Sequence, residues 1–361
     1  MDVCLFLNHA CNLACTYCYN GRKFHRAMSE EVMRKGVDLA FHGSCARLSF
    51  FGGEPLLERE LLTKAVRYAR EKERALKKIP LRFSMTTNGT LIDAAFLDLM
   101  KREQFHLVFS LDGCRDSHER TRPYENGASS FDTVVENLEQ AMAQMPAVET
   151  ITVIDPANVD TLPESFSFLM DLGVRNLNFS LNYEADWQDD DLGRLENALD
   201  ELGDRYVDHY RNETDFAFDL FDSKIITHLK GGYACRDRCK FGHEELCVAP
   251  SGNLYPCERL VGEDTRTDVT IGTVQSGVDL EKVMHLKQRK DRPDKECESC
   301  KLQNRCMFWC GCVNYALTGD VGKTSGLLCA MEQLSIAAAD KAAGTLYKEQ
   351  NPLFIRKFYA V

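Results

Sequence analysis

Three closely spaced cysteines constrain this chain more than any other feature of its sequence. Cys11, Cys15 and Cys18 have the spacing CxxxCxxC and directly follow a short apolar run at residues 3–8. Thiolates normally hold all four irons of a cubane iron–sulfur cluster. Three thiolates leave one iron open, and an open coordination position distinguishes a reactive metal site from a closed structural one. The spacing predicts a reactive [4Fe–4S] site. A zinc knuckle is the alternative, although zinc sites usually pair two CxxC units or add a distant His pair.

The composition is that of a folded protein with unusually many cysteines. The 361 residues are 44% hydrophobic and 27% charged, enough for one large and one smaller domain. The net charge of −11, without a lysine–arginine run, disfavours nucleic acid as a partner. No apolar stretch approaches the roughly 20 residues of a spanning helix, and Asp2 stands where a signal peptide carries basic residues. We therefore expect a cytoplasmic protein whose 16 cysteines bind metal rather than form disulfides.

Short apolar runs alternate with helical patterns through the first half of the chain. Strands are predicted at 3–8, 47–51, 81–86, 106–110, 150–154 and 176–181. Helices are predicted near 29–43, 58–78, 93–103, 131–145 and 160–172, with Ser29 and Asp93 at two helix starts. Six β/α repeats imply parallel strands with right-handed crossovers. Because six units are too few for an eight-fold barrel, we predict an α/β fold with a partial (β/α)6 barrel.

The second half of the chain has a different pattern. Residues 183–191 are acidic and are interpreted as a solvated loop, and helices are predicted at 192–211 and 222–231. We expect four regions, namely a barrel, a helical linker, a small cysteine-rich domain and a C-terminal helix with a tail, at 1–182, 183–234, 235–335 and 336–361.

The cysteine triplet, with Tyr19 directly after it, resembles the signature of the radical S-adenosylmethionine (radical SAM) superfamily. The resemblance implies that S-adenosylmethionine chelates the open iron of the cluster. It also implies that an electron from the reduced cluster cleaves the sulfonium, giving a 5′-deoxyadenosyl radical that abstracts hydrogen from a C–H bond. The protein then supplies position and excludes water, while the cofactor supplies the chemistry.

The loop after the second predicted strand suits the same cofactor. It reads Gly52-Gly53-Glu54-Pro55, and its two glycines allow a backbone to approach a ligand closely. By itself this segment is equally consistent with a plain tight turn. By resemblance it is the GGEP motif, which contacts the amino group of the cofactor's methionine.

Further predicted cofactor contacts follow later strands. Thr87 and Asn88 are polar partners for a ribose, and the resemblance assigns Ser110 and Arg122 to the carboxylate of S-adenosylmethionine. Arg122 suits a carboxylate because its guanidinium binds in bidentate fashion; a surface salt bridge is the alternative. Leu181, at the end of the sixth predicted strand, completes the set.

A second group of cysteines fills residues 235–329 and resembles the SPASM extension of radical SAM enzymes. The resemblance implies two auxiliary [4Fe–4S] clusters, so that the chain would bind three clusters and S-adenosylmethionine. The first auxiliary cluster is assigned to Cys235, Cys239, Cys257 and Cys310. The second is assigned to Cys297, Cys300, Cys306 and Cys329. Cys247 or Cys312 is an alternative to Cys235, and a zinc ribbon is the alternative for the region. Other thiols, such as Cys4, Cys45 and Cys114, are interpreted as buried core residues.

Glu258, next to Cys257, is the candidate catalytic residue. A carboxylate near a cluster can take a proton after hydrogen abstraction, and in sulfatase-maturating enzymes an aspartate at this position is assigned that role. Arg259 follows it, and neutralisation of Glu258 by Arg259 is the alternative.

The resemblance predicts an enzyme that modifies a ribosomally made precursor peptide, with a thioether or carbon–carbon crosslink as the leading outcome. Formylglycine formation in a sulfatase and peptide epimerisation are the alternative reactions, and a non-catalytic electron-transfer protein is the alternative class. The expected partners are the precursor peptide and an external flavodoxin or ferredoxin. A first strand at residue 3 leaves no room for a fused recognition domain, so we expect a leader peptide to be bound either by the barrel and SPASM surfaces or by a separate peptide-recognition protein.

Overall fold

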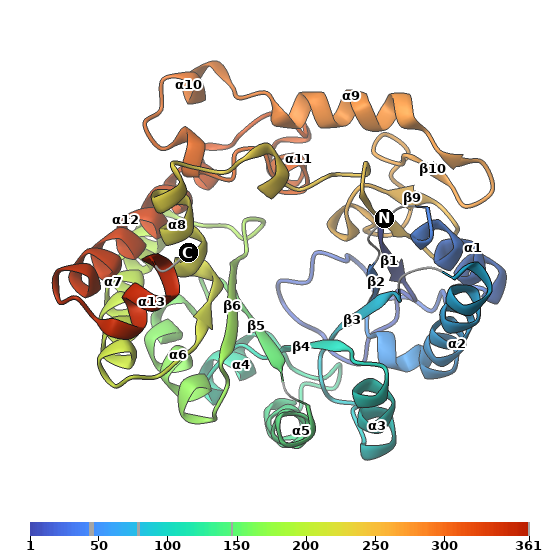
Figure 1. The fold of residues 1–361 in the computed structure, drawn as a ribbon, viewed down its shortest axis with the longest axis horizontal. Coiled ribbons are helices and arrows are strands. Elements are labelled where there is room, and N and C mark those ends of the chain that lie inside the picture. Colours follow the sequence, from blue (N-terminus) through green and yellow to red (C-terminus); the bar gives the residue numbers. More distant parts are fainter. Residues whose placement is uncertain (43–46, 78–79, 146, 360–361) are drawn as a thin grey trace. The chain divides into compact units, whose positions relative to one another are not determined.

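The computed structural model describes residues 1–42, 47–77, 80–145 and 147–359, and Figure 1 labels their helices and strands. These residues divide into two compact units. Unit 1 contains Met1–Ser110, Pro123–Val148 and Lys240–Arg289. Unit 2 contains Leu111–Arg122, Glu149–Cys239 and Lys290–Val361. The four domain ranges predicted from the sequence stay a prediction.

Unit 1 is built on a largely parallel sheet with the strand order β4-β3-β2-β1-β8-β9. The strands are β1 Asp2–Phe6, β2 Arg47–Phe51, β3 Arg82–Thr87, β4 His106–Ser110, β8 Glu245–Val248 and β9 Leu254–Tyr255. Strands β1 to β4 pair in parallel, β8 pairs in parallel with β1, and β9 is antiparallel to β8. Because alternate side chains of a strand point to one face, Leu5, Phe50 and Phe83 are buried together in the core.

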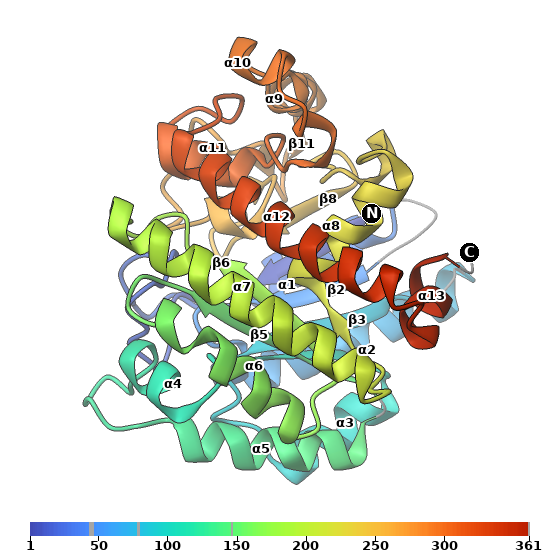
Figure 2. The ribbon, with the colours of Figure 1, turned by 90° about the vertical axis from the view of Figure 1, so that its left-hand side faces the viewer.

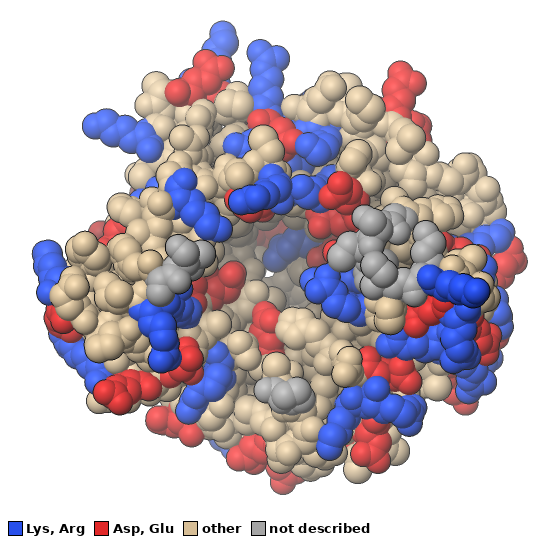
Figure 3. Space-filling model, viewed as in Figure 1, with Lys and Arg blue, Asp and Glu red and all other residues tan. Residues whose placement is uncertain are grey.

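Four of the five described helices of unit 1 begin within one residue of a predicted start, and the fifth, Leu280–Asp291, was not predicted. The five helices are α1 Glu30–Ala40, α2 Arg59–Leu76, α3 Ala94–Arg102, α5 Phe131–Gln144 and most of α9 Leu280–Asp291. The Ser29 side chain accepts the Val32 amide at the start of α1, and Asp93 accepts the Phe96 amide at the start of α3, which confirms both predicted caps. Figure 3 shows positive and negative side chains interspersed over α1 and α2.

Unit 2 combines a short parallel sheet with most of the helices. β5 Val148–Ile154, whose first residue belongs to unit 1, β6 Asn176–Leu181 and β7 Ala217–Phe218 pair in that order. The helices are α4 Arg115–Thr121, α6 Leu162–Asp171, α7 Asp189–Arg211, α8 Asp219–Lys230, α10 Lys295–Glu298, α11 Gly311–Thr318, α12 Gly326–Lys348 and α13 Pro352–Tyr359. The long helices α7 and α12 run side by side (Figure 2).

All six predicted strands are present, with ends that differ by at most two residues from the prediction. Two details differ. The predicted acidic loop is wrong over residues 189–191, because these residues form the first turn of α7, where Asp191 accepts the Gln188 amide (3.1 Å) and carboxylates suit the helix dipole. The predictions also lack the helices α4, α9, α10 and α11 and the strands β7, β8 and β9. These three strands have two to four residues and are too short to carry a periodic signal.

Candidate functional site

The cysteine loop follows β1, and backbone hydrogen bonds hold it against unit 1. Leu7 N donates to Phe51 O (2.8 Å), and Ala14 N donates to Pro123 O (2.9 Å). Between the cysteines, Leu13 is fully buried and acts as an apolar anchor. The anchored loop presents three half-buried thiols, those of Cys11, Cys15 and Cys18.

The glycines after β2 allow this loop and the next one to touch. A Cβ atom added to Gly53 would lie only 2.0 Å from Ala10 O, so no other residue fits without a backbone shift. Glu54 N then donates to Ala10 O (2.9 Å), directly before Cys11. The GGEP segment therefore positions the first cysteine as well as any ligand.

The carboxylate of Glu54 joins the loops after β2 and β3. Glu54 is fully buried, and its Oε1 accepts from the Thr87 hydroxyl (2.8 Å) and the Leu56 amide (2.9 Å). Its Oε2 accepts from the Asn88 amide (2.8 Å), and Asn88 Nδ2 donates to Cys11 Sγ (3.7 Å). Since carboxyl ends of parallel strands meet at one edge, the structure brings together four predicted site residues from three strands.

The charges around the loop suit thiolate ligands. Burial raises the pKa of the Cys11 thiol to about 11, so that a thiolate there needs a positive partner. Lys23 Nζ lies 2.6 Å from Cys18 Sγ and is a positive group beside the loop that the sequence interpretation missed. In the described part of the chain, no three His, Cys, Asp or Glu side chains form a group that could hold a single metal ion. A cubane cluster differs, because each thiolate binds its own iron, and three separate thiols on one loop fit that requirement.

The remaining predicted cofactor contacts lie at other strand and helix ends. Ser110 is the last residue of β4 in unit 1, and Leu181 is the last residue of β6 in unit 2. Arg122, also in unit 2, ends α4 and is only 5% exposed, so the alternative of a surface salt bridge is wrong. His118, one turn earlier, is fully buried, and burial lowers its pKa to about 2.

Glu258 and its neighbours approach the cysteine loop within unit 1. Cys257 caps the short turn η4 Glu258–Leu260, and Glu258 Oε2 lies 3.7 Å from Cys257 Sγ. The Arg259 guanidinium lies 4.6 Å from the centre of the Tyr19 ring, a cation–π contact. Burial raises the pKa of Tyr19 well above its usual value. The segment that carries the candidate base therefore contacts the residue that follows Cys18.

In unit 2, four thiols assigned to the second auxiliary cluster belong to one region. Cys297 lies in α10 and Cys329 in the first turn of α12. Burial raises the pKa of Cys297 and, to about 12, that of Cys306, and the neighbouring Cys329 thiol adds to both shifts. Cys300 is exposed. Thus three of the four predicted ligands are electrostatic neighbours, as ligands of one cluster must be.

The first auxiliary set is divided between the units. Cys257 belongs to unit 1, and the other three members belong to unit 2, namely Cys235, Cys239 and Cys310. Among the alternatives, Cys247 is fully buried in β8 beside Cys4 of β1. Cys312 is buried and its Sγ lies 3.6 Å from Cys310 Sγ. Cys45 lies outside the described residues.

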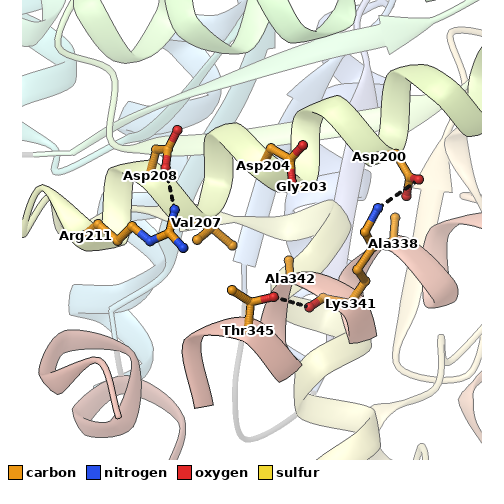
Figure 4. Close-up of a pocket in the computed structure, with 10 residues that line it drawn as sticks. All are labelled: Asp200, Gly203, Asp204, Val207, Asp208, Arg211, Ala338, Lys341, Ala342 and Thr345. Carbon is orange, nitrogen blue, oxygen red and sulfur yellow. Dashed lines mark hydrogen bonds and ion pairs between the residues drawn. The ribbon is translucent and has the colours of Figure 1, made fainter. Parts of the chain in front are cut away.

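A separate pocket of about 280 Å³ lies between α7 and α12 and contains no predicted site residue (Figure 4). Lys341 of α12 pairs with Asp200 of α7 across the pocket (2.9 Å), and Arg211 pairs with Asp208 along α7 (2.9 Å). In addition, no helix of the described residues is both long and apolar enough to cross a membrane.

Comparison with known proteins identifies the class that this fold and site define. Residues 5–169 match the model of the radical SAM superfamily, so this part of the chain is a radical SAM domain. The match includes the cysteine loop, the GGEP segment, Thr87, Asn88, Ser110 and Arg122. The radical SAM domain predicted by resemblance from the cysteine triplet is confirmed over these residues.

Relatives and solved structures extend the likeness beyond that domain. The chain is 24% identical over 325 residues to a serine-type anaerobic sulfatase-maturating enzyme of Klebsiella aerogenes, covering 83% of this chain and 77% of that protein. It is 28% identical over 179 residues to an uncharacterized protein of Methanocaldococcus jannaschii, covering 49% of this chain and only 61% of that protein.

Two solved structures show the same fold. The native enzyme anSMEcpe with bound AdoMet matches with a TM-score of 0.80 at 20% identity, over 97% of this chain and 99% of that chain. Streptococcus suis SuiB bound to the precursor peptide SuiA matches with a TM-score of 0.64 at 15% identity, over 90% and 75% of the two chains. The predicted fold class is thereby confirmed for nearly the whole chain.

Proposed function

We propose that this chain is a radical SAM enzyme that modifies a peptide, and that it installs a thioether or carbon–carbon crosslink in a ribosomally made precursor. The observation that carries the proposal is the edge of unit 1 where Cys11, Glu54, Thr87 and Asn88 meet. When bound, the cluster and S-adenosylmethionine supply a 5′-deoxyadenosyl radical that abstracts hydrogen from the substrate.

The residues of this edge have separate tasks in the proposal. Cys11, Cys15 and Cys18 hold the cluster. The three hydrogen bonds that Glu54 accepts keep Asn88 beside Cys11. Because the Glu54 carboxylate is occupied in this way, we assign the contact with the methionine amino group to the backbone of the GGEP segment. Ser110, Arg122 and Leu181 complete the cofactor contacts, and two auxiliary clusters use the eight assigned cysteines of residues 235–329.

A peptide substrate is supported by the solved relatives. Structures of anSMEcpe hold AdoMet together with a peptide, and that of SuiB holds a precursor peptide. In the proposal, Glu258 takes the proton released after hydrogen abstraction, since its carboxylate lies on the segment that contacts Tyr19. A flavodoxin or ferredoxin supplies the electron.

The test is an anaerobic incubation of the reduced, reconstituted chain with S-adenosylmethionine and cysteine-containing peptides encoded beside its gene. Release of 5′-deoxyadenosine shows radical SAM chemistry, and none would contradict the proposed enzyme class. Loss of two hydrogens per site, with thiols that no longer react with an alkylating agent, identifies a thioether. The same loss with free thiols and no aldehyde identifies a carbon–carbon link.

Sulfatase maturation is the second candidate, because the match to the Klebsiella aerogenes enzyme covers 83% of the chain. It predicts an aldehyde, reactive with a hydrazide probe, on a sulfatase-derived peptide. Epimerisation predicts no mass change in ordinary water. When the reaction is run in heavy water, deuterium in the recovered peptide would identify it.

A further inference from the structure

A buried ion pair in unit 2 is unused by the proposed chemistry. Lys224 of α8 donates to both carboxylate oxygens of Glu332 of α12, at 2.8 and 2.7 Å. Both side chains are only 4% exposed. A buried pair of this kind is weak evidence for stability, because desolvation offsets the attraction between the charges. Its position therefore needs another explanation.

The pair is tied to the chain beside a predicted cluster ligand. Glu332 Oε2 also accepts from the Met307 amide (2.9 Å), one residue after Cys306. On the other side of that cysteine, Arg305 donates to Asp340 of α12 (2.7 and 2.8 Å) and to Lys224 O (3.0 Å). Hydrogen bonds thus connect both residues that flank Cys306 to the Lys224–Glu332 ion pair or to the helices α8 and α12 that carry it.

The same carboxylate lies near the second predicted ligand. Cys329 is three residues before Glu332 in α12, so both residues lie on one face of the helix. Besides burial, which raises the pKa of the Cys306 thiol, the charge of Glu332 raises it and that of Lys224 lowers it. The two charges therefore act on this thiol in opposite directions.

We propose that Lys224 and Glu332 are positioning residues for the auxiliary cluster of Cys297, Cys300, Cys306 and Cys329. The pair holds the Cys306 segment at a set distance from α12, and its opposite charges set the reduction potential of the cluster. The inference rests on the proposed auxiliary cluster. Its physical basis is that cluster potentials follow net charge and hydrogen bonding around the sulfurs.

The opposite charges of Lys224 and Glu332 predict that removing one or the other shifts the reduction potential of the cluster in opposite directions. Glu332→Gln removes a negative charge and leaves the Lys224 ammonium alone, so the reduction potential rises. Lys224→Met leaves the Glu332 carboxylate alone, so the potential falls. The double variant Lys224→Met/Glu332→Gln returns towards the wild-type potential. Lys224→Arg keeps the charge and causes a smaller shift than Lys224→Met.

The experiment is an EPR-monitored redox titration of the full chain, in a background of Cys11→Ala/Cys15→Ala/Cys18→Ala that lacks the first cluster. The relevant signal is the one that disappears in Cys329→Ala. Lys341→Met is the matched control, because it removes a positive charge from an exposed pair of the same helix and should leave the potential unchanged (Figure 4). Iron content and the unfolding midpoint of the cluster-free chain are measured for every variant.

Opposite shifts in the two single variants, at unchanged iron content, support the inference. Shifts of the same sign, or none, overturn it and leave the proposed function intact. If Lys224→Met does not fold, Glu332→Gln and Lys224→Arg still test the inference. A higher reduction potential in Glu332→Gln, with little change in Lys224→Arg, supports the inference. An unchanged or lower potential in Glu332→Gln overturns it. A wild-type chain without auxiliary iron would overturn the proposed cluster, and this inference with it.

Discussion

The two cysteine-rich regions of the molecule are supported by different kinds of structure. In unit 1, residues 11–18 follow a central strand of a parallel sheet and are fixed by backbone hydrogen bonds and by the buried carboxylate of Glu54. In unit 2, residues 297–306 have only α10 and the single turn η5 Gln303–Arg305, and side-chain contacts fasten them to α8 and α12.

Under the proposed function, the difference predicts how each region would acquire its cluster. A loop on a packed sheet has its shape before a cluster arrives, because burial and strand pairing have already fixed the backbone. A segment with little regular structure buries few apolar groups, and metal binding can then supply its folding free energy. We expect the first site to be preformed and the second to be completed by its cluster.

The largest expected effect separates chemistry from structure at the first site. The variant Cys11→Ala/Cys15→Ala/Cys18→Ala should release no 5′-deoxyadenosine and lose the iron of one cluster, while its circular dichroism spectrum stays that of the parent. Chemical iron analysis and product chromatography measure these outcomes. Loss of the folded spectrum would break the comparison, since it would show that the first loop also depends on its metal.

The next effect concerns removal of all metal. In the chain freed of iron by a chelator, amide hydrogen exchange should rise strongly across residues 297–329 and stay slow in β1, β2 and β3. The physical reason is that paired strands keep their hydrogen bonds without the cluster. Exchange measured by mass spectrometry checks this, and equal protection of both regions in the iron-free chain would contradict it.

A smaller effect follows from the hub of the first site. Glu54→Ala leaves three buried donors without their acceptor and should lower the free energy of unfolding by about 3 kcal/mol. Glu54→Gln should cost about 1 kcal/mol, because its amide oxygen still accepts hydrogen bonds. The measurement is urea unfolding of the cluster-free chain. The exposed Glu60→Ala variant is the control and should change stability by less than about 0.5 kcal/mol. If Glu54→Ala and Glu60→Ala changed stability equally, the role assigned to Glu54 would be contradicted.

The smallest effect tests the close approach of two loops. Gly53→Ala places a Cβ atom against Ala10 O and should cost about 2 kcal/mol, with weaker binding of S-adenosylmethionine in equilibrium dialysis. Gly193→Ala is the matched control: it lies within α7 with open space around it, and should stabilise the chain by up to about 1 kcal/mol. Unchanged cofactor binding in Gly53→Ala would show that the loops are not coupled.

Much of the fold was readable from local sequence patterns. The alternation of short apolar runs with amphipathic segments located the six strands, and the N-cap residues Ser29 and Asp93 located two helix starts. The CxxxCxxC spacing indicated a radical SAM domain, which the match over residues 5–169 confirms. Strand order then placed the GGEP segment and Asn88 beside Cys11, because neighbouring parallel strands end at one edge.

Other features depended on long-range contacts, and no local pattern encodes them. The pairing of β8 with β1, which buries Cys247 beside Cys4, joins residues about 240 positions apart through a strand of only four residues. The Glu54 carboxylate resembles a ligand in the sequence, and only the tertiary structure shows it occupied by Thr87, Asn88 and Leu56.

The sequence by itself indicated which cysteines are candidate iron ligands, and it located the strands that carry Cys11, Glu54 and Asn88 to one edge. Only the tertiary structure showed which polar groups hold the site together through hydrogen bonds, as Glu54 does. It also showed which charged side chains pair in the interior, as Lys224 and Glu332 do. The reason is physical. Spacing along a chain reports local geometry and ligand type, whereas the partner of a buried charge is chosen by how distant helices pack.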